Sequence, residues 1–322
     1  MPLDTPILLI AFNRPDTTRR VIQAIRRADP RRVYVAVDGP RHHVSGDRER
    51  VLNVHALAHE LGTGCHVKTL FREHNLGCKR AVESAIDWFF ENEPMGIVLE
   101  DDCLPNDSFF AFTSAMLLRY AGDHRVMSVS GSNPQRCCAR SEHSYYFTKY
   151  MHCWGWASWR RAWRCNAPEL PTSPLSDSEI IRFYPSSSAE IGYWRRRFAK
   201  VRAQRINSWD YGWQRSIWAN GGLVVAPQVN MIENIGFGEG ATHTNDRQDD
   251  RNLAAAELIV RSHPKCVEQH VAMDHHEAEH LYRFGQKTIL NRIKTEWRSV
   301  LQQIYSVGLS ARTVMPPSRS LP

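Results

Sequence analysis

Three consecutive carboxylates, Glu100, Asp101 and Asp102, follow the apolar run at residues 96–99 and precede a segment with a helical pattern. Adjacent carboxylates repel one another unless a cation or several hydrogen-bond donors compensate their charge. Carboxylate oxygens are the ligands that Mg²⁺ and Mn²⁺ prefer, and such an ion could in turn hold a diphosphate. The triplet therefore predicts either a metal site or a solvated turn that also caps the next helix, with Asp107 as the better cap.

Polar residues also follow two strand-like runs nearer the N-terminus. The first run, residues 6–12, ends in Asn13 and Arg14, and the second ends in Asp38. Ligands of open parallel sheets bind at the carboxyl ends of the strands, so these side chains would line the same edge as the acidic triplet. An arginine and an aspartate at that edge suit a phosphate and a base or ribose, although an Asp-Gly turn also has purely structural uses.

The elements that must position these residues alternate along the first part of the chain. Helical patterns, one of which begins with Pro15, separate strand-like runs at 6–12, 32–39, 66–71, 96–99 and 126–130. Alternation of this kind predicts an α/β fold with a mostly parallel sheet and helices on both faces.

The alternation stops near residue 135, and the rest of the chain is aromatic and rich in loops. Eight of the ten tryptophans fall between Trp154 and Trp218. Because tryptophan is usually buried, we expect most of them to form a second hydrophobic cluster.

Six segments, in this order, resemble the GT-A nucleotide-sugar glycosyltransferases, above all the N-acetylglucosaminyltransferase I family and its bacterial relatives: IAFNRP, VDGPR, VLEDDCLPNDSFF, CWGWASWRRAW, SWDYGW and PQVNMIENIGFGEGATHT. The resemblance covers about residues 6–245. It implies a GT-A, Rossmann-like catalytic domain over 1–250, with a nucleotide-binding half to about 135 and an aromatic acceptor-side half over 136–250. Residues 251–322 would form a helical extension.

The resemblance also implies roles on the donor side. Arg14 and Asp38 would contact the nucleotide. Glu100 and Asp101 would contact the sugar and the ribose, while Asp102 would bind Mn²⁺, or Mg²⁺, on the diphosphate.

Further roles are implied in the second half. Asp210 would act as the general base, and Trp209 would lie against the donor sugar. Trp154 and Gly155 would shape the sugar pocket, and His243 falls in a segment similar to the family's mobile loop over the donor. A single tryptophan elsewhere in this half is expected to pack rather than to contact sugar.

The sequence departs from the family at one motif. The pattern Trp-Asp-Asp-Trp is replaced by Trp-Asp-Tyr-Gly-Trp, with Tyr211 in place of the second acid and one extra residue before Trp213. No anchor or stem like those of the eukaryotic members is recognisable, so we do not expect their protein acceptor.

The implied reaction needs one protein base. A divalent ion can stabilise a nucleoside diphosphate leaving group without a protein acid. Asp210 would take the proton of an acceptor hydroxyl as it attacks the anomeric carbon from the opposite face, which inverts that centre. The alternative for Asp210 is the N-cap of the following helix. The family resemblance alone suggests UDP-N-acetylglucosamine as donor and a glycan or lipid-linked hydroxyl as acceptor.

Three other functions stay open. A sugar-nucleotide nucleotidyltransferase would use a similar sheet and metal site, although the glycine-rich phosphate loop it needs is missing after the first run. Residues 276–280 read HEAEH, which matches the zinc-protease pattern His-Glu-x-x-His, but Glu279 fills a position that is normally uncharged and no convincing third ligand follows. A non-catalytic protein that binds nucleotide sugars is the third.

Composition excludes several classes of protein. No apolar run approaches the ~18 residues of a membrane span, and no signal peptide is recognisable, so we expect a cytoplasmic protein. The eight cysteines include no Cys-x-x-Cys pair, which argues against a zinc ribbon and a redox motif.

The formal charge of +7 comes mostly from the tail after Tyr282. Residues 286–305 have the pattern of a basic amphipathic helix. This helix could lie on the inner face of an anionic membrane and bring the protein to a lipid-linked acceptor, or it could pack on the catalytic domain or on a second subunit. The basic residues form no nucleic-acid motif, so we expect no nucleic-acid partner.

Overall fold

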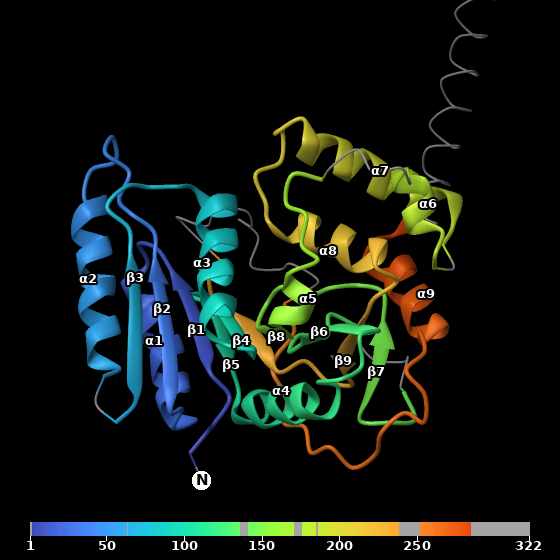
Figure 1. The fold of residues 1–322 in the computed structure, drawn as a ribbon, viewed down its shortest axis with the longest axis horizontal. Coiled ribbons are helices and arrows are strands. Elements are labelled where there is room, and N and C mark those ends of the chain that lie inside the picture. The colour runs from blue at the N-terminus through green and yellow to red at the C-terminus, as the bar shows by residue number, and fades with distance from the viewer. Residues whose placement is uncertain are drawn as a thin grey trace, which may run out of the picture.

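The structure, a computed structural model, describes residues 2–62, 64–135, 141–170, 176–184, 186–237 and 252–284. An eight-stranded sheet runs through this part of the chain (Figure 1). Its strands lie in the order β3 (His66–Phe71), β2 (Arg32–Val37), β1 (Ile7–Ala11), β4 (Met95–Glu100), β8 (Trp156–Trp159), β6 (Val126–Ser130), β9 (Leu223–Pro227) and β7 (Tyr145–Thr148). Because only β8 and β7 run against the other strands of this sheet, it is mostly parallel.

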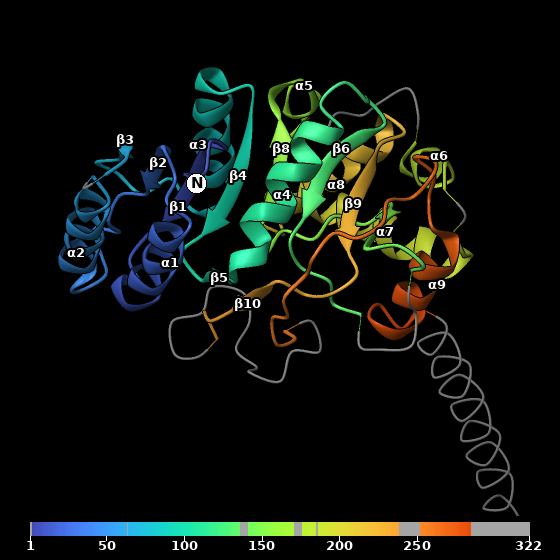
Figure 2. The same ribbon diagram turned by 90° about the horizontal axis from the view of Figure 1, so that it is seen from below.

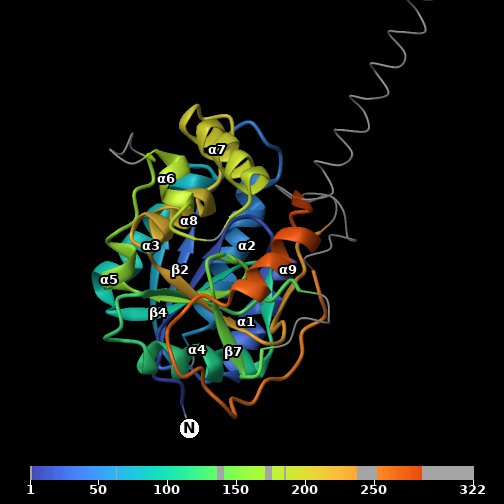
Figure 3. The same ribbon diagram turned by 90° about the vertical axis from the view of Figure 1, so that its right-hand side faces the viewer.

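Helices pack on both faces of the sheet. The helices α1 (Pro15–Arg27) and α2 (Asp47–Glu60) lie on one face, and α3 (Cys78–Asn92) lies on the other (Figure 3). Pro15 occupies the first turn of α1, as the sequence predicts. The predicted α/β fold, with a mostly parallel sheet flanked by helices, is therefore confirmed.

The helix after the acidic triplet, α4 (Asp107–Arg119), begins where the sequence predicts, but its cap differs. The Asn106 side chain accepts a hydrogen bond from the backbone N–H of Phe109 at 3.1 Å. Asn106 is still extended, whereas Asp107 already belongs to the first turn. The prediction of Asp107 as the cap is therefore wrong by one residue.

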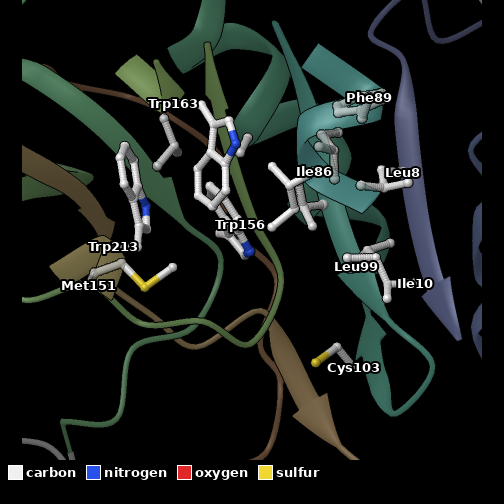
Figure 4. Packing of buried hydrophobic residues seen from close by; sticks show 14 of the residues in the cluster. Leu8, Ile10, Ile86, Phe89, Leu99, Cys103, Met151, Trp156, Trp163 and Trp213 are labelled. Carbon is white, nitrogen blue, oxygen red and sulfur yellow. The ribbon is translucent and has the colours of Figure 1, made fainter. Parts of the chain in front are cut away.

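Tryptophans of the second half join the core of the first half. Trp156 in β8 lies 5.5 Å from Trp209, and Trp163 in α5 (Arg160–Trp163) lies 5.0 Å from Trp213 in α8 (Asp210–Ala219), measured between ring centroids. Figure 4 shows Trp156 facing Ile86, which belongs to α3. The expected burial is confirmed for Trp156, Trp159, Trp163, Trp194, Trp209, Trp213 and Trp218.

Two further helices, α6 (Asp177–Ile181) and α7 (Ser188–Arg202), lie above α8 in the view of Figure 1. A small second sheet pairs β5 (Cys103–Pro105) with β10 (Ile232–Asn234) directly after the acidic triplet (Figure 2). The acidic edge and the later chain segments are thus joined by backbone pairing.

The described part of the expected C-terminal extension is mostly irregular. Its one helix there is α9 (Val271–His280), which lies beside β7. Asp274 fastens α9 to β7 by accepting hydrogen bonds from the Thr148 hydroxyl and from the Lys149 backbone N–H at 3.1 Å. The expected amphipathic helix at 286–305 lies outside the described residues. None of the described helices is long and apolar enough to cross a bilayer.

Candidate active site

The neighbouring strands β1 and β4 bring Arg14 to the acidic triplet. Ile10 and Glu100 are register partners, so the residues that follow the two strands meet at one edge. The Arg14 guanidinium donates to Asp101 at 2.6 Å and to Asp102 at 2.9 Å. The backbone N–H of Phe12 adds a third bond, to Asp101, at 3.1 Å. The predicted meeting of Arg14 with the triplet is thus present in the structure.

Negative charge accumulates at this edge. Burial, followed by the charges of Asp102 and Asp101, raises the pKa of Glu100 to about 8, and Asp210 also contributes. Burial likewise raises the pKa of Asp101 to about 6, against the opposing charge of Arg14. Asp101 and Asp102 share the Arg14 guanidinium and Glu100 lies close to both, so the edge can accommodate further positive charge.

Asp210 stands at the first position of α8. The N-cap position belongs to Trp209, whose side chain makes no capping bond, so Asp210 is not the N-cap. The Ser208 hydroxyl donates to the Asp210 carboxylate. Asp210 is close enough to Glu100 and Cys78 for its charge to raise both of their pKa values. The structure therefore places Asp210 within electrostatic reach of Glu100, and its role as the base stays a prediction.

A cavity of about 420 Å³ opens beside Asp210. Its walls come from the loop before β8, from α7, from the start of α8 and from the segment after α9. The aromatic and charged members of its lining are His152, Trp154, Tyr193, Trp194, Tyr211, Tyr282, Arg197, Asp210 and Arg283. Asp210 therefore belongs both to the acidic edge and to this cavity.

Gly155 fixes the loop that carries Trp154 into the cavity wall. Its φ of +60° lies in the left-handed region, and a Cβ there would come within 2.5 Å of Cδ1 of Ile232. The carbonyl of Gly155 also accepts a bond from the N–H of Gly131 at 2.8 Å. Trp154 in turn lies 6.2 Å, edge to face, from Phe237. A larger residue at position 155 would disturb this arrangement.

The segment after β10 covers Asp102. The backbone N–H of Ile235 donates to the carbonyl of Asp102 at 2.8 Å. A Cβ on Gly236 would lie 2.8 Å from Nη1 of Arg14 and closer still to the Asp102 carboxylate. The predicted site residue His243 follows shortly afterwards but lies outside the described residues, so its role over the donor stays a prediction.

Asp38 lies at the predicted edge and binds the neighbouring loop. Its carboxylate accepts bonds from the backbone N–H groups of Gly39, Leu76 and Gly77 at 2.9, 3.0 and 3.2 Å, and from the side chain of Asn75 at 2.9 Å. Burial raises the pKa of Asp38, and these backbone donors oppose that rise. In this structure Asp38 joins two loops, and its contact with a nucleotide stays a prediction.

Asp47 is a buried carboxylate that the sequence analysis missed. It accepts bonds from the Asn13 amide, from the Arg41 backbone N–H at 3.0 Å and side-chain Nε at 2.9 Å, and from Arg50 at 3.0 Å. Hydrogen bonding to Arg41, against the effect of burial, holds the pKa of Asp47 far below its ordinary value. Asp47 therefore fixes Asn13 and the loop that carries Arg41. An acid at the start of a helix looks like an ordinary first-turn residue, so the sequence gives no distinct signal.

Trp209 is placed in the core. It is 4% exposed, stacks against Trp156 and is not part of the cavity lining. Its predicted contact with a sugar stays a prediction, and the burial favours packing.

The HEAEH segment forms the last part of α9. Glu277 is buried, with its carboxylate 3.4 Å from Nε2 of His152, while His280 is exposed. Among the described residues no group of three or more His, Cys, Asp or Glu side chains could hold a metal ion. The protease interpretation therefore finds no support in the described part of the chain.

The acidic edge fits a divalent cation through its charge and through Asp102. The side chain of Asp102 is 15% exposed, with one oxygen on Arg14 and the other 3.5 Å from the Cys103 sulfur. As the described residues supply no three-ligand group, oxygens of a bound diphosphate and water would have to complete the coordination.

No family model matches the sequence, and no curated protein is significantly similar to it. Solved structures with partial similarity include TarS 1–349 of S. aureus, at TM-score 0.42 and 10% identity over 71% of this chain and 59% of TarS. HddC from Yersinia pseudotuberculosis aligns at TM-score 0.30 and 9% identity, over 58% of this chain and 83% of the HddC chain. Apo-UDP-glucose pyrophosphorylase aligns at TM-score 0.37 and 9% identity, over 72% of this chain and 93% of its own chain. The match thus spans less than two thirds of the TarS chain, and scores this low do not establish a shared fold or activity.

Proposed function

We propose that this chain is a metal-dependent, inverting glycosyltransferase that moves a sugar from a nucleoside-diphosphate donor to a hydroxyl acceptor. One observation carries the proposal: the carboxylate of Asp210 lines a cavity of about 420 Å³ and lies near enough to Glu100 of the Arg14-bound triplet to raise the pKa of Glu100. Small-molecule sites have volumes of ~300–1,000 Å³, so a sugar can be accommodated. A direct displacement needs a donor-binding cluster and a base that faces an acceptor site.

The acidic edge would bind the donor. Asp102 would hold Mn²⁺ or Mg²⁺, which when bound supplies positive charge next to the leaving diphosphate. Arg14 positions Asp101 and Asp102, and its own charge favours a phosphate at the same edge. UDP-N-acetylglucosamine is the first donor to test, because the six ordered segments resemble a family that uses it.

Asp210 would act on the acceptor. An acceptor hydroxyl in the cavity attacks the anomeric carbon, the bond from that carbon to the diphosphate oxygen breaks, and the hydroxyl proton passes to the Asp210 carboxylate. The bond from Ser208 orients this carboxylate. General-base assistance is typically worth about 10²- to 10⁴-fold in rate.

The acceptor would be a glycan or a lipid-linked hydroxyl. Residues 286–305 would hold the protein on the inner face of an anionic membrane. Co-sedimentation with anionic vesicles, with and without residues 286–322, tests that contact. Equal binding of both chains would exclude a role for this segment.

A donor screen with Mn²⁺ or Mg²⁺ tests the proposed reaction by following release of nucleoside diphosphate. We expect Asp210→Asn to reduce turnover by about 10²-fold or more while UDP binding stays within about twofold. The control is Asp107→Asn, because the Asp107 side chain is 74% exposed and lies in α4. Turnover that survives both Asp210→Asn and a chelator would refute the proposal, and release of pyrophosphate instead would favour a nucleotidyltransferase.

A further inference from the structure

The cavity beside Asp210 has a basic side. Arg197 and Arg283 both belong to its lining, whereas Asp210 is the one carboxylate among the described lining residues. A neutral sugar needs no excess of cations, since hydroxyl groups bind equally well to amides and carboxylates. A guanidinium group in the wall of this cavity therefore suits an acceptor that carries negative charge.

Arg197 differs in its contacts from the other arginines nearby. Arg202, in the same helix α7, forms an ion pair with Asp177. Arg215 in α8 also pairs with Asp177, with 3.0 Å between its Nε and the carboxylate. Within the described part of the chain no carboxylate forms such a pair with Arg197. The guanidinium lies instead 5.1 Å from the ring centroid of Tyr193 and 6.0 Å from that of Tyr211.

The rings of Tyr193 and Tyr211 lie against the Arg197 guanidinium, and a side-chain hydrogen bond with Tyr193 also raises its pKa. An arginine has five N–H groups, so contact with the rings and one hydrogen bond leave further donors available to an anion. Burial lowers the pKa of Arg197, but the nearby groups Tyr193, Tyr211 and Asp210 raise it beyond its ordinary value. Arg197 is therefore a permanent cation in the same cavity as the proposed base.

The neighbouring arginines in α7 give the contrast. Arg195 and Arg196 are exposed, whereas Arg197 is half-buried and lines the cavity. Of these three consecutive arginines, Arg195 and Arg196 therefore lie on the solvent-exposed face of α7, and Arg197 alone lines the cavity.

We propose that the acceptor carries an oxyanion, either a carboxylate or a phosphate ester, next to the hydroxyl that Asp210 deprotonates, and that Arg197 binds this anion. Arginine recognises both groups through two parallel hydrogen bonds. The rings of Tyr193, Tyr211 and Trp154 supply apolar faces for the sugar itself. This inference rests on the proposed transferase function, since it concerns the acceptor of that reaction.

Binding of simple probes to the full chain tests the proposal without turnover. Methyl glucuronide and glucose 6-phosphate represent the two sources of the anion, and methyl glucoside is the neutral reference. We expect at least one anionic probe to bind about tenfold more tightly than the neutral one, which corresponds to about 1.4 kcal/mol. Arg197→Gln should remove this preference, and Arg196→Gln, as the matched exposed control, should keep it. The preferred probe identifies the anion.

Two results would overturn the proposal: equal binding of all three probes to the wild type, or a preference that survives Arg197→Gln. If Arg197→Gln does not fold, as judged by circular dichroism, Arg197→Lys decides the matter. That variant keeps the charge but loses the two parallel donors, so the preference should fall, and an unchanged preference counts against the assignment.

UDP binding to the same samples separates the two proposals. A wild type that binds UDP but shows no anion preference refutes the anion site alone, whereas a wild type that shows the anion preference but binds no nucleoside diphosphate refutes the transferase.

Discussion

Arg14 and Asp102 are paired at 2.9 Å at the edge of the sheet, on the carboxylate that would also hold a divalent cation. A cation therefore has to share this carboxylate with Arg14 or displace one of its bonds. Because the Arg14 guanidinium also binds Asp101 at 2.6 Å, it can release Asp102 and still remain anchored. The pair thus leaves the edge ordered before any donor arrives, which lowers the cost of binding.

The cation assignment predicts the behaviour of Asp102→Asn. A ligand that binds the folded state alone stabilises it by about 2.7 kcal/mol at one hundred times its dissociation constant. Mn²⁺ with UDP should therefore raise the Tm of the wild type and leave that of Asp102→Asn almost unchanged. Thermal unfolding with and without both ligands measures this. Asp107→Asn should respond like the wild type, and an equal rise in Asp102→Asn would exclude Asp102 as the ligand.

Glu100 should make the ligand-free protein less stable as the pH rises. Its folded pKa of about 8 is above the ordinary value of 4.5, so between these values the folded state binds more protons than the unfolded state. The contribution of Glu100 is therefore fully present below pH 4.5 and is lost as the pH rises through 8.

Glu100→Gln should remove much of this pH dependence and should be more stable than the wild type near pH 9, by at least about 1 kcal/mol, since one pKa unit corresponds to about 1.4 kcal/mol. Urea unfolding between pH 5 and 9 measures the free energy. Parallel curves for the two proteins would show that Glu100 is ionised in the folded state throughout.

Asp47 should stabilise the loop that carries Arg41. Asp47 is completely buried and accepts bonds from three side chains and from the Arg41 backbone N–H, so Asp47→Ala leaves all of these donors without this partner. We expect a loss of roughly 2–4 kcal/mol in the free energy of unfolding, and weaker UDP binding. Arg50→Gln removes one of the side-chain bonds to Asp47, from a half-exposed donor, and should cost less than about 1 kcal/mol. Similar losses in both variants would contradict a central role for Asp47.

Gly155 offers a test of the cavity wall with a close control. Gly155 and Gly221 have φ values of +60° and +62°, but a Cβ meets Ile232 at the first position and nothing within 4 Å at the second. Gly221→Ala should therefore cost only the backbone strain, about 1 kcal/mol, whereas Gly155→Ala should cost roughly 1–3 kcal/mol more. Urea unfolding measures both. Equal losses would show that the loop accommodates a methyl group.

The sequence predicts the first-half strands well because each is a short apolar run bounded by polar turns, whereas β7, β8 and β9 of the same sheet lie in the half for which no strand was predicted. The strands β3 and β6 occupy the predicted residues 66–71 and 126–130, and β4 extends its prediction by one residue at each end. The cap of α4 was misplaced because Asn106 and Asp107 have equal capping chemistry, and only the backbone conformation distinguishes them.

The candidate site was predictable where it follows from strand order. Because β1 and β4 are parallel neighbours, Arg14 comes close to the triplet regardless of how the loops at this edge are folded. The partners of Asp38 and Asp47 were not predictable, because they depend on how separate loops fold over the edge, as with Asn75, which is 37 positions from Asp38 in the chain. The cavity was missed for the same reason, since no motif links α7 to the residues after α9.

The wall that Leu281, Tyr282 and Arg283 contribute to the cavity comes after every strand of the sheet and after α9. A protease that cuts before residue 281 would therefore leave the acidic edge whole and remove only part of the wall of the cavity proposed to bind the acceptor. In such a trimmed molecule, donor hydrolysis by water and transfer to an acceptor would respond differently, which gives a means of separating the two half-sites within one polypeptide.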